Sequence, residues 1–156
     1  MRKLFSLALL FISFFSFSQS KAQVKALIIA NEEIGNLKCN YLKMEHPNLN
    51  TEYCVQIIYK NQQFVYKQEQ DTIQLKSKLD IVKLISDLKL GLAVINDEDK
   101  DVNIDNSNYT IFKNKGYTDN NFIVIANKQL TIKSPINKFF TNQLISWLNS
   151  IDFGKG

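Results

Sequence analysis

Several residue types are scarce in this chain of 156 residues, and their scarcity excludes several kinds of site. The chain has five glycines, two prolines, two cysteines and a single histidine, His46. With so few glycines and no glycine-rich phosphate-binding motif, a backbone cradle for a nucleotide is not expected. A single histidine excludes zinc motifs built on a histidine pair, and a catalytic triad would depend on His46 alone. We therefore predict no cofactor and assign no catalytic residue.

A clear excess of positive charge is also missing once the first 22 residues are set aside. The whole chain has 19 basic and 15 acidic residues, but Arg2, Lys3 and Lys21 lie in that segment, which leaves 16 basic residues against 15 acidic ones. The remaining lysines are spread along the chain and do not alternate with aromatic residues. Nucleic-acid binding, which needs a basic patch, is therefore not expected.

What the chain does have is an N-terminal segment typical of an export signal. Arg2 and Lys3 precede an apolar run at residues 4–17, and small residues then precede a predicted cut after Ala22. The run is short of the about 20 apolar residues that a membrane span needs, and no later stretch is long enough. We therefore predict a signal peptide at residues 1–22, a single domain at 23–153 and a frayed tail at 154–156. The mature protein is expected in the periplasm or outside the cell, and not in a membrane.

Both cysteines, Cys39 and Cys54, follow the predicted cut. In an oxidising compartment such a pair predicts a disulfide. Closing a loop of about 15 residues would add roughly 3 kcal/mol of stability in the chain-entropy model. The alternative is a pair of buried free thiols.

The first half of the mature chain has the pattern of several strands followed by a helix. Strands are predicted at residues 24–30, 53–59, 64–67 and 72–76, with turns or loops at 31–36, 46–50 and 60–63, while residues 36–44 are ambiguous. Helical spacing then predicts a helix at 78–90, with an apolar stripe of Leu79, Ile81, Val82, Leu84, Ile85 and Leu88. Ser77 is its predicted N-cap, Gly91 the residue that ends it, and 92–95 a short strand.

The second half repeats this order. Strands are predicted at residues 109–113, 121–126 and 129–133, and Ser134 is the predicted N-cap of a helix that begins at Pro135. The apolar stripe of this helix is predicted to contain Ile136, Phe139, Phe140, Leu144, Trp147, Leu148 and Ile151.

The two helix entries are similar to each other. Residues 73–80 and 130–137 agree in character at almost every position, and Lys76/Lys133 and Ser77/Ser134 are identical. The similarity fits two strand-strand-strand-helix halves, although ordinary strand-to-helix junctions share it. Runs of strands that end in a helix predict an α+β fold, with an antiparallel sheet and two amphipathic helices on one face.

An acidic segment after the first helix is a candidate calcium site. Oxygen-bearing side chains occur at every second position, at Asp97, Asp99, Asp101, Asn103 and Asp105, as in an EF-hand loop. However, Val102 stands where that loop needs glycine, and Asn108 stands where it needs glutamate. The alternative is a solvated loop entering an edge strand, with Val102 and Ile104 turned inward.

Aromatic residues gather around the first predicted hairpin, at Tyr53, Tyr59, Phe64 and Tyr66. An aromatic strand face is suited to stacking on a sugar or holding a peptide, although core packing explains the same pattern. These residues are the predicted binding surface.

The sequence thus predicts a small exported binding or interaction module without catalysis, whose partner is a protein, peptide or glycan. The alternative is a small secreted hydrolase that uses carboxylates such as Glu32, Glu33, Glu52 or those at 97–105. A pocket that joins two carboxylates would favour the hydrolase, whereas a flat aromatic surface or an exposed edge strand would favour the binding module.

Overall fold

The computed structural model describes residues 24–47, 50–60, 70–97, 99–115, 121–126 and 133–155. The strands are β1 (Lys25–Ile34), β2 (Leu37–Glu45), β3 (Glu52–Lys60), β4 (Gln70–Leu75), β5 (Asn103–Asp105), β6 (Thr110–Lys115), β7 (Asn121–Ala126) and β8 (Lys133–Ile136). The helices are α2 (Lys78–Val94) and α3 (Lys138–Ser150). The predicted signal peptide and the predicted strand at 64–67 lie outside the described residues.

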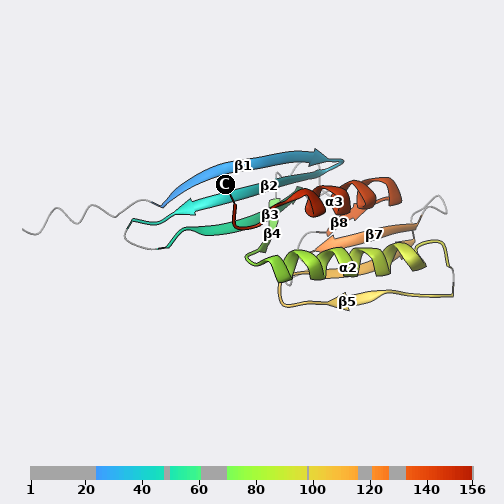
Figure 1. Cartoon of the computed structure of the whole chain (residues 1–156). Coiled ribbons are helices and arrows are strands. Elements are labelled where there is room, and N and C mark those ends of the chain that lie inside the picture. The colour runs from blue at the N-terminus through green and yellow to red at the C-terminus, as the bar shows by residue number, and fades with distance from the viewer. Residues whose placement is uncertain are drawn as a thin grey trace, which may run out of the picture.

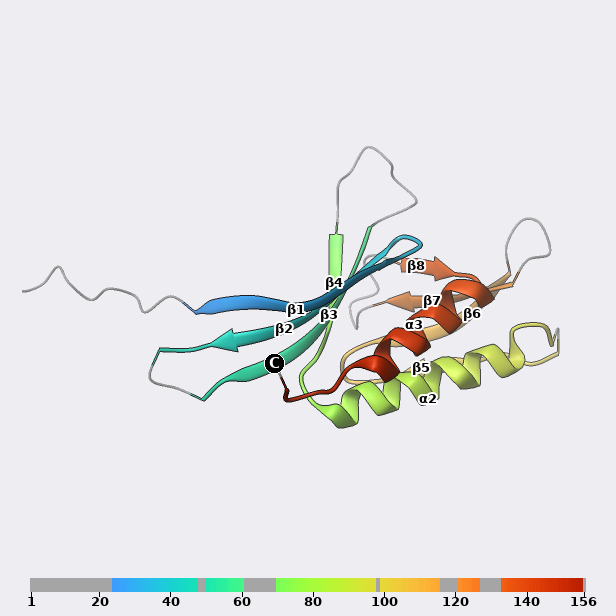
Figure 2. The ribbon, with the colours of Figure 1, turned by 45° about the horizontal axis from the view of Figure 1, so that its top comes forward.

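The strands form two antiparallel sheets of four, in the orders β1-β2-β3-β4 and β5-β6-β7-β8. The predicted α+β class is therefore confirmed. Helices α2 and α3 lie side by side and run in opposite directions (Figure 1). Helix α2 contacts β4, β6 and β7, whereas α3 contacts β7, β8 and β1. Strands β1, β2 and β3 extend beyond the helices at the end that holds Lys25, Glu45 and Glu52 (Figure 2).

The first sheet contains more strand than the sequence predicts. Strand β1 continues through the predicted turn at 31–33 to Ile34, and the turn lies at Gly35–Asn36. Gly35 has a φ of +60°, a conformation that glycine adopts without steric cost. The ambiguous segment at 36–44 is β2, a central strand between β1 and β3. The alternation of apolar and polar residues expected of a strand is unclear in its sequence, because residues on both of its faces are buried from Cys39 to Leu42.

Helix α2 begins where predicted but ends later. The Ser77 side chain accepts a hydrogen bond from the Asp80 N–H at 3.1 Å, as expected of an N-cap. The helix continues through Gly91 to Val94, so the predicted stop at Gly91 and strand at 92–95 are wrong. Glycine at this position serves packing and does not end the helix, since a Cβ on residue 91 would lie 3.0 Å from Ile123 Cδ1. The stripe is also narrower than predicted, because Leu79 and Val82 are exposed.

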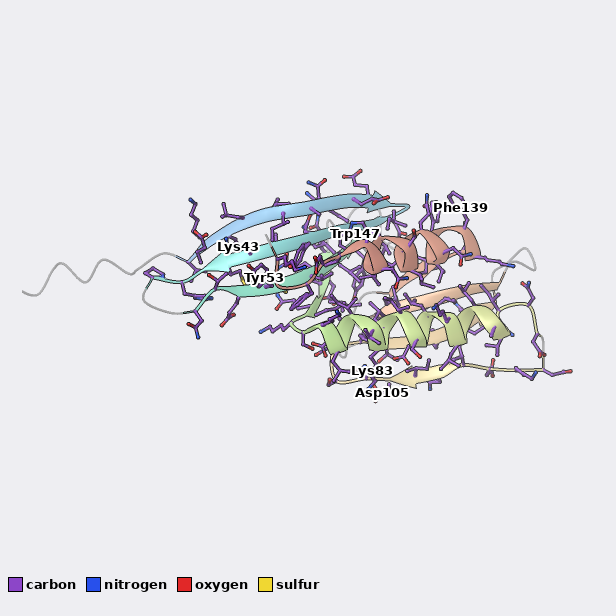
Figure 3. The ribbon with its side chains drawn as sticks, viewed as in Figure 1. Lys43, Tyr53, Lys83, Asp105, Phe139 and Trp147 are labelled. Carbon is purple, nitrogen blue, oxygen red and sulfur yellow. The ribbon has the colours of Figure 1, made fainter. Side chains whose placement is uncertain are left out.

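Helix α3 begins three residues later than predicted. Its N-cap is Asn137, whose Oδ1 accepts from the Phe140 N–H at 2.9 Å, whereas Ser134 and Pro135 lie in β8. Because β8 is an edge strand, a proline that lacks an N–H is tolerated there. Trp147 is 6% exposed, as predicted for a core residue, but Phe139 is 63% exposed. The two residues lie at opposite ends of α3 (Figure 3).

In the described part of the chain, residues 25–94 and 103–150 have the same order of elements, four strands followed by a helix. The predicted order has three strands, and the predicted match of Ser77 with Ser134 is three residues out of step, since Ser77 corresponds to Asn137. In the correct alignment Leu84-Ile85-Ser86 matches Leu144-Ile145-Ser146, and buried and exposed positions coincide along this stretch of the two helices. The two halves therefore resemble each other in which helix residues are buried, and not only in the residues at which the helices begin.

The predicted Cys39–Cys54 disulfide is not formed, and both thiols are free and buried. The register explains this, because Cys39 is opposite Ile57 and Cys54 is opposite Leu42. Three residues of strand separate Cys54 from Ile57, so the two Cα atoms are roughly 11 Å apart on ideal strand spacings. The side chains also point to opposite faces of the sheet, whereas a disulfide needs Cα atoms within about 7 Å.

Candidate functional site

The exposed large apolar side chains of the described residues fall into two groups. One group belongs to β1 and the residue before it: Val24 is 50% exposed, Leu27 37%, Ile28 58% and Ile29 38%. The other lies on the helices and consists of Leu79, Val82, Leu90 and Phe139. Single exposed apolar residues are ordinary, but a continuous group marks an interaction surface.

The β1 group lies on the edge of a sheet. Strand β1 pairs with β2 on one side, and no described strand pairs with its other side (Figure 1). Its backbone therefore offers a row of N–H and C=O groups to another strand. The sequence of the exposed half, Lys25-Ala26-Leu27-Ile28-Ile29, contains a single charged residue. This half of β1 is the candidate binding surface.

A β-bulge separates the apolar half of β1 from its charged half. Ile28 is opposite Leu42 and Ala30 is opposite Tyr41, so Ile29 has no partner of its own in β2. Beyond the bulge, Glu32 and Glu33 are exposed near the turn at Gly35. The Phe140 ring of α3 packs against Gly35, which holds this end of β1 on the body of the protein.

The residues of the predicted aromatic surface do not share one environment in the structure. Tyr59 is fully buried in the core, so it is not available to a partner. Tyr53 is half-buried, with its ring centroid 6.0 Å from that of Tyr41 and 6.2 Å from that of Phe153. Phe64 and Tyr66 lie outside the described residues. Tyr53 lies on the part of the first sheet that extends past the helices (Figure 3).

The C-terminal segment that was predicted to be frayed is held by Tyr41. The Gly154 N–H donates to the Tyr41 hydroxyl at 2.8 Å, and the carbonyls of Asp152 and Lys155 lie 3.3 Å from the same hydroxyl. Phe153 packs against the Tyr41 ring at 5.9 Å between centroids. Residues as far as Lys155 are therefore part of the domain.

The acidic segment is arranged around a lysine of the protein itself. The Lys113 ammonium donates to the backbone carbonyls of Asp97 and Lys100. A hydrogen bond from Lys100 holds the pKa of Asp97 below its usual value. Backbone carbonyls of this kind are ligands that calcium accepts, but here they accept hydrogen bonds from Lys113. Among the described residues, no three His, Cys, Asp or Glu side chains are grouped so that they could hold a metal ion.

The rest of the segment follows the alternative prediction of a solvated loop that enters an edge strand. Val102 and Ile104 are half-buried, whereas Asp99, Asp101, Asn103 and Asp105 are exposed. The Asp105 carboxylate accepts from the Thr110 hydroxyl at 3.3 Å. The alternation of exposed and half-buried residues from Asp101 to Asp105 thus reflects the entry of the chain into β5 and the two faces of that strand.

The carboxylates named for a hydrolase are on the surface. Glu32, Glu33 and Glu52 are all exposed, and Glu52 lies 3.6 Å from His46 Nε2. An open depression of about 290 Å³ between α2 and α3 is lined by Val82, Ile85, Ser86, Lys89 and Asn149. None of these five lining residues carries a carboxylate or an imidazole.

A buried carboxylate that the sequence did not single out is Asp87 on α2. It is 7% exposed and accepts a 2.8 Å hydrogen bond from the Tyr109 hydroxyl. Burial, with the hydrogen bond and the charge of Asp87, raises the pKa of Tyr109. Asp87 occurs in an otherwise apolar helical pattern, a position at which a charged residue needs a partner. This pair connects α2 to the residue that precedes β6.

The cysteines are unsuited to nucleophilic chemistry. Burial raises the pKa of the Cys39 thiol to about 12, with a further contribution from the negative charge of Glu32. Burial also raises the pKa of Cys54. A nucleophilic cysteine is a thiolate at neutral pH, so neither residue fits that role.

None of the helices in the described part of the chain is long and apolar enough to cross a membrane. The sequence matches no known family model and no characterised protein, and the structure matches no solved structure.

Proposed function

We propose that this protein is an exported, non-catalytic module that binds another polypeptide by adding its strand to the edge of β1. The observation that carries the proposal is the exposure of Val24, Leu27, Ile28 and Ile29 along one continuous sheet edge. In strand addition, backbone hydrogen bonds supply affinity and alternating side chains supply selectivity. An exposed edge strand is also the feature that favours a binding module over a hydrolase.

The charge around β1 supports a polypeptide as the ligand. Lys25, Glu32 and Glu33 are spaced along a strand that is otherwise apolar or neutral between residues 26 and 31. A complementary strand needs an apolar centre with opposite charges at its ends. A glycan offers neither a row of backbone donors and acceptors nor such a charge pattern.

Export of the module is part of the proposal. It depends on the sequence of residues 1–22, and N-terminal sequencing of protein recovered from the envelope or culture fluid should begin at Gln23. A sequence that begins at Met1 in that material would contradict export by cleavage.

Site-specific photocrosslinking tests the binding surface. A benzoylphenylalanine at Leu27 or Ile29, in protein exported by its own host, should give covalent adducts on illumination. The same side chain at Leu79, which is 75% exposed on α2, is the matched control. Adducts formed equally at both surfaces, or at neither, would contradict binding at the edge of β1. The intact mass of each adduct identifies the partner.

A further inference from the structure

We infer that the strand added to β1 is β1 of a second copy of this chain. The two strands run antiparallel about a two-fold axis and join two four-stranded sheets into one sheet of eight strands. The inference deepens the proposed function and rests on it, because it names the partner of the same edge. Three features of β1 support it: charge, side-chain facing and exposure.

The charges of β1 are complementary to themselves. The positive charge, Lys25, lies at one end of the strand, and the negative charges, Glu32 and Glu33, lie at the other. Antiparallel pairing of two copies brings the positive end of each strand to the negative end of the other. Opposite charges directly across a strand pair are stabilising, whereas like charges are destabilising.

The bulge places the side chains of Lys25 and Glu32 on the same face of the sheet. Lys25 and Leu27 are opposite Glu45 and Lys43 of β2, and Ala30 and Glu32 are opposite Tyr41 and Cys39. These four β2 positions differ by two residues at each step, so all of them point to one face of the sheet. Without the bulge, residues 25 and 32 would point to opposite faces.

A single register places opposite charges across from each other and also keeps paired side chains on the same face of the sheet. It places Lys25 of each copy across from Glu32 of the other, and Leu27 across from Ala30. Ile28 and Ile29 then meet next to the two-fold axis, and Ile28 is 58% exposed in the single chain. The pairing therefore covers the most exposed large apolar side chain of β1 and adds backbone hydrogen bonds along the same edge.

The free edge is long enough for this pairing. Strand β1 has 10 residues, and its N-terminal half extends past both helices (Figure 2). A contact through one strand pair is small compared with a standard interface of about 1,600 Å². We therefore expect a dimer that dissociates on dilution, in contrast to a permanent one.

Charge reversal tests the register directly. Sedimentation velocity of the exported protein over a dilution series should show a reversible monomer–dimer equilibrium. Lys25→Glu alone places like charges across the axis twice, so it should weaken association about tenfold or more. Glu32→Lys alone should do the same. An equimolar mixture of the two variants restores both opposite-charge pairs, so the mixture should dimerise as strongly as the unmodified protein.

Recovery on mixing cannot come from misfolding, since each variant would have to fold in order to pair. Ile29→Lys should weaken the dimer, because it places two lysines beside the axis. Leu79→Lys, which also replaces an exposed apolar residue by lysine but on α2, should leave the monomer–dimer equilibrium unchanged. A monomer at all concentrations, or variants that fail to recover when mixed, would overturn the self-pairing.

The two proposals fail in different ways. Adducts at Leu27 that contain a different protein, together with a monomeric sample, would overturn self-pairing and leave strand addition in place. Adducts that contain a second copy support both proposals. A monomeric sample without adducts at β1 would overturn both.

Discussion

The Tyr109 hydroxyl donates a 2.8 Å hydrogen bond to the carboxylate of Asp87, and both residues are buried. The bond joins α2 to the residue that precedes β6, 22 positions later in the chain. A carboxylate is strongly hydrated in the unfolded chain, so its burial here depends on this partner. The pair therefore fixes how α2 packs on the second sheet.

Removal of the hydroxyl should destabilise the protein while keeping its shape. Tyr109→Phe leaves the buried Asp87 carboxylate without its donor and should lower the free energy of unfolding by about 1–3 kcal/mol. Urea unfolding measured by circular dichroism gives this value. Asp99→Asn, which changes an exposed carboxylate, is the control and should have little effect. An equal loss in both variants would contradict the special role of the pair.

The same pair predicts a dependence of stability on alkaline pH. Burial and the nearby Asp87 raise the pKa of folded Tyr109 above its ordinary value of 10.0, so the folded state retains the phenolic proton more strongly than the unfolded state does. The associated stability is complete below about pH 10 and declines as the pH rises above it. The unfolding free energy should therefore fall more steeply above this pH in the unmodified protein than in Tyr109→Phe. Parallel pH profiles would contradict the assignment, and the comparison cancels the titration of lysines.

The two cysteines should behave as inaccessible thiols. Alkylation of the exported protein in denaturant without reductant should add two labels per chain, because no bond joins Cys39 to Cys54. Without denaturant, labelling at pH 8 should be slow, since both thiols are buried. Intact mass measures both results. A chain that accepts labels in denaturant only after reduction would show that the bridge exists.

Truncation of Trp147 should cost far more than truncation of Phe139, although both are large aromatic residues on α3. Trp147 is 6% exposed and Phe139 is 63% exposed. Trp147→Ala should therefore lower the unfolding free energy by about 3–5 kcal/mol, and Phe139→Ala by well under half of that. Thermal and urea unfolding of the two variants provide the comparison. A cost below about 1 kcal/mol for Trp147→Ala would mean that α3 is peripheral to the core.

The position of the second N-cap can be tested by alanine substitution. Asn137→Ala removes the acceptor for the Phe140 N–H and should cost about 1 kcal/mol, as should Ser77→Ala at the start of α2. Ser146→Ala, at an exposed position within α3, is the control. No loss for Asn137→Ala would indicate that α3 begins elsewhere.

Elements whose signal is local agree well with the sequence. Residues 53–59 and 121–126 are predicted strands because β-branched and aromatic residues favour strands, and they match β3 and β7 to within one residue at each end. Ser77 was identified from its side chain and its place before an apolar periodic segment. The candidate site was predicted less well, because Tyr59 shows the same aromatic pattern whether it faces a partner or the core. Nothing in the sequence indicated that β1 would be an edge strand.

The sequence by itself determined the α+β class, the strand-then-helix order and the first helix cap, because these follow from the period of apolar residues and from hydrogen bonds within a few positions. Tertiary structure alone decided the rest. Gly91 lies within a helix and does not end it, and glycine is needed there because Ile123 fills the space beside it. Cys39 and Cys54 remain apart because strand register places them three residues out of step on opposite faces. The exposure of β1 depends on the order of strands in the sheet. That order is a relation between segments that are distant in the chain, so a local sequence pattern cannot predict it.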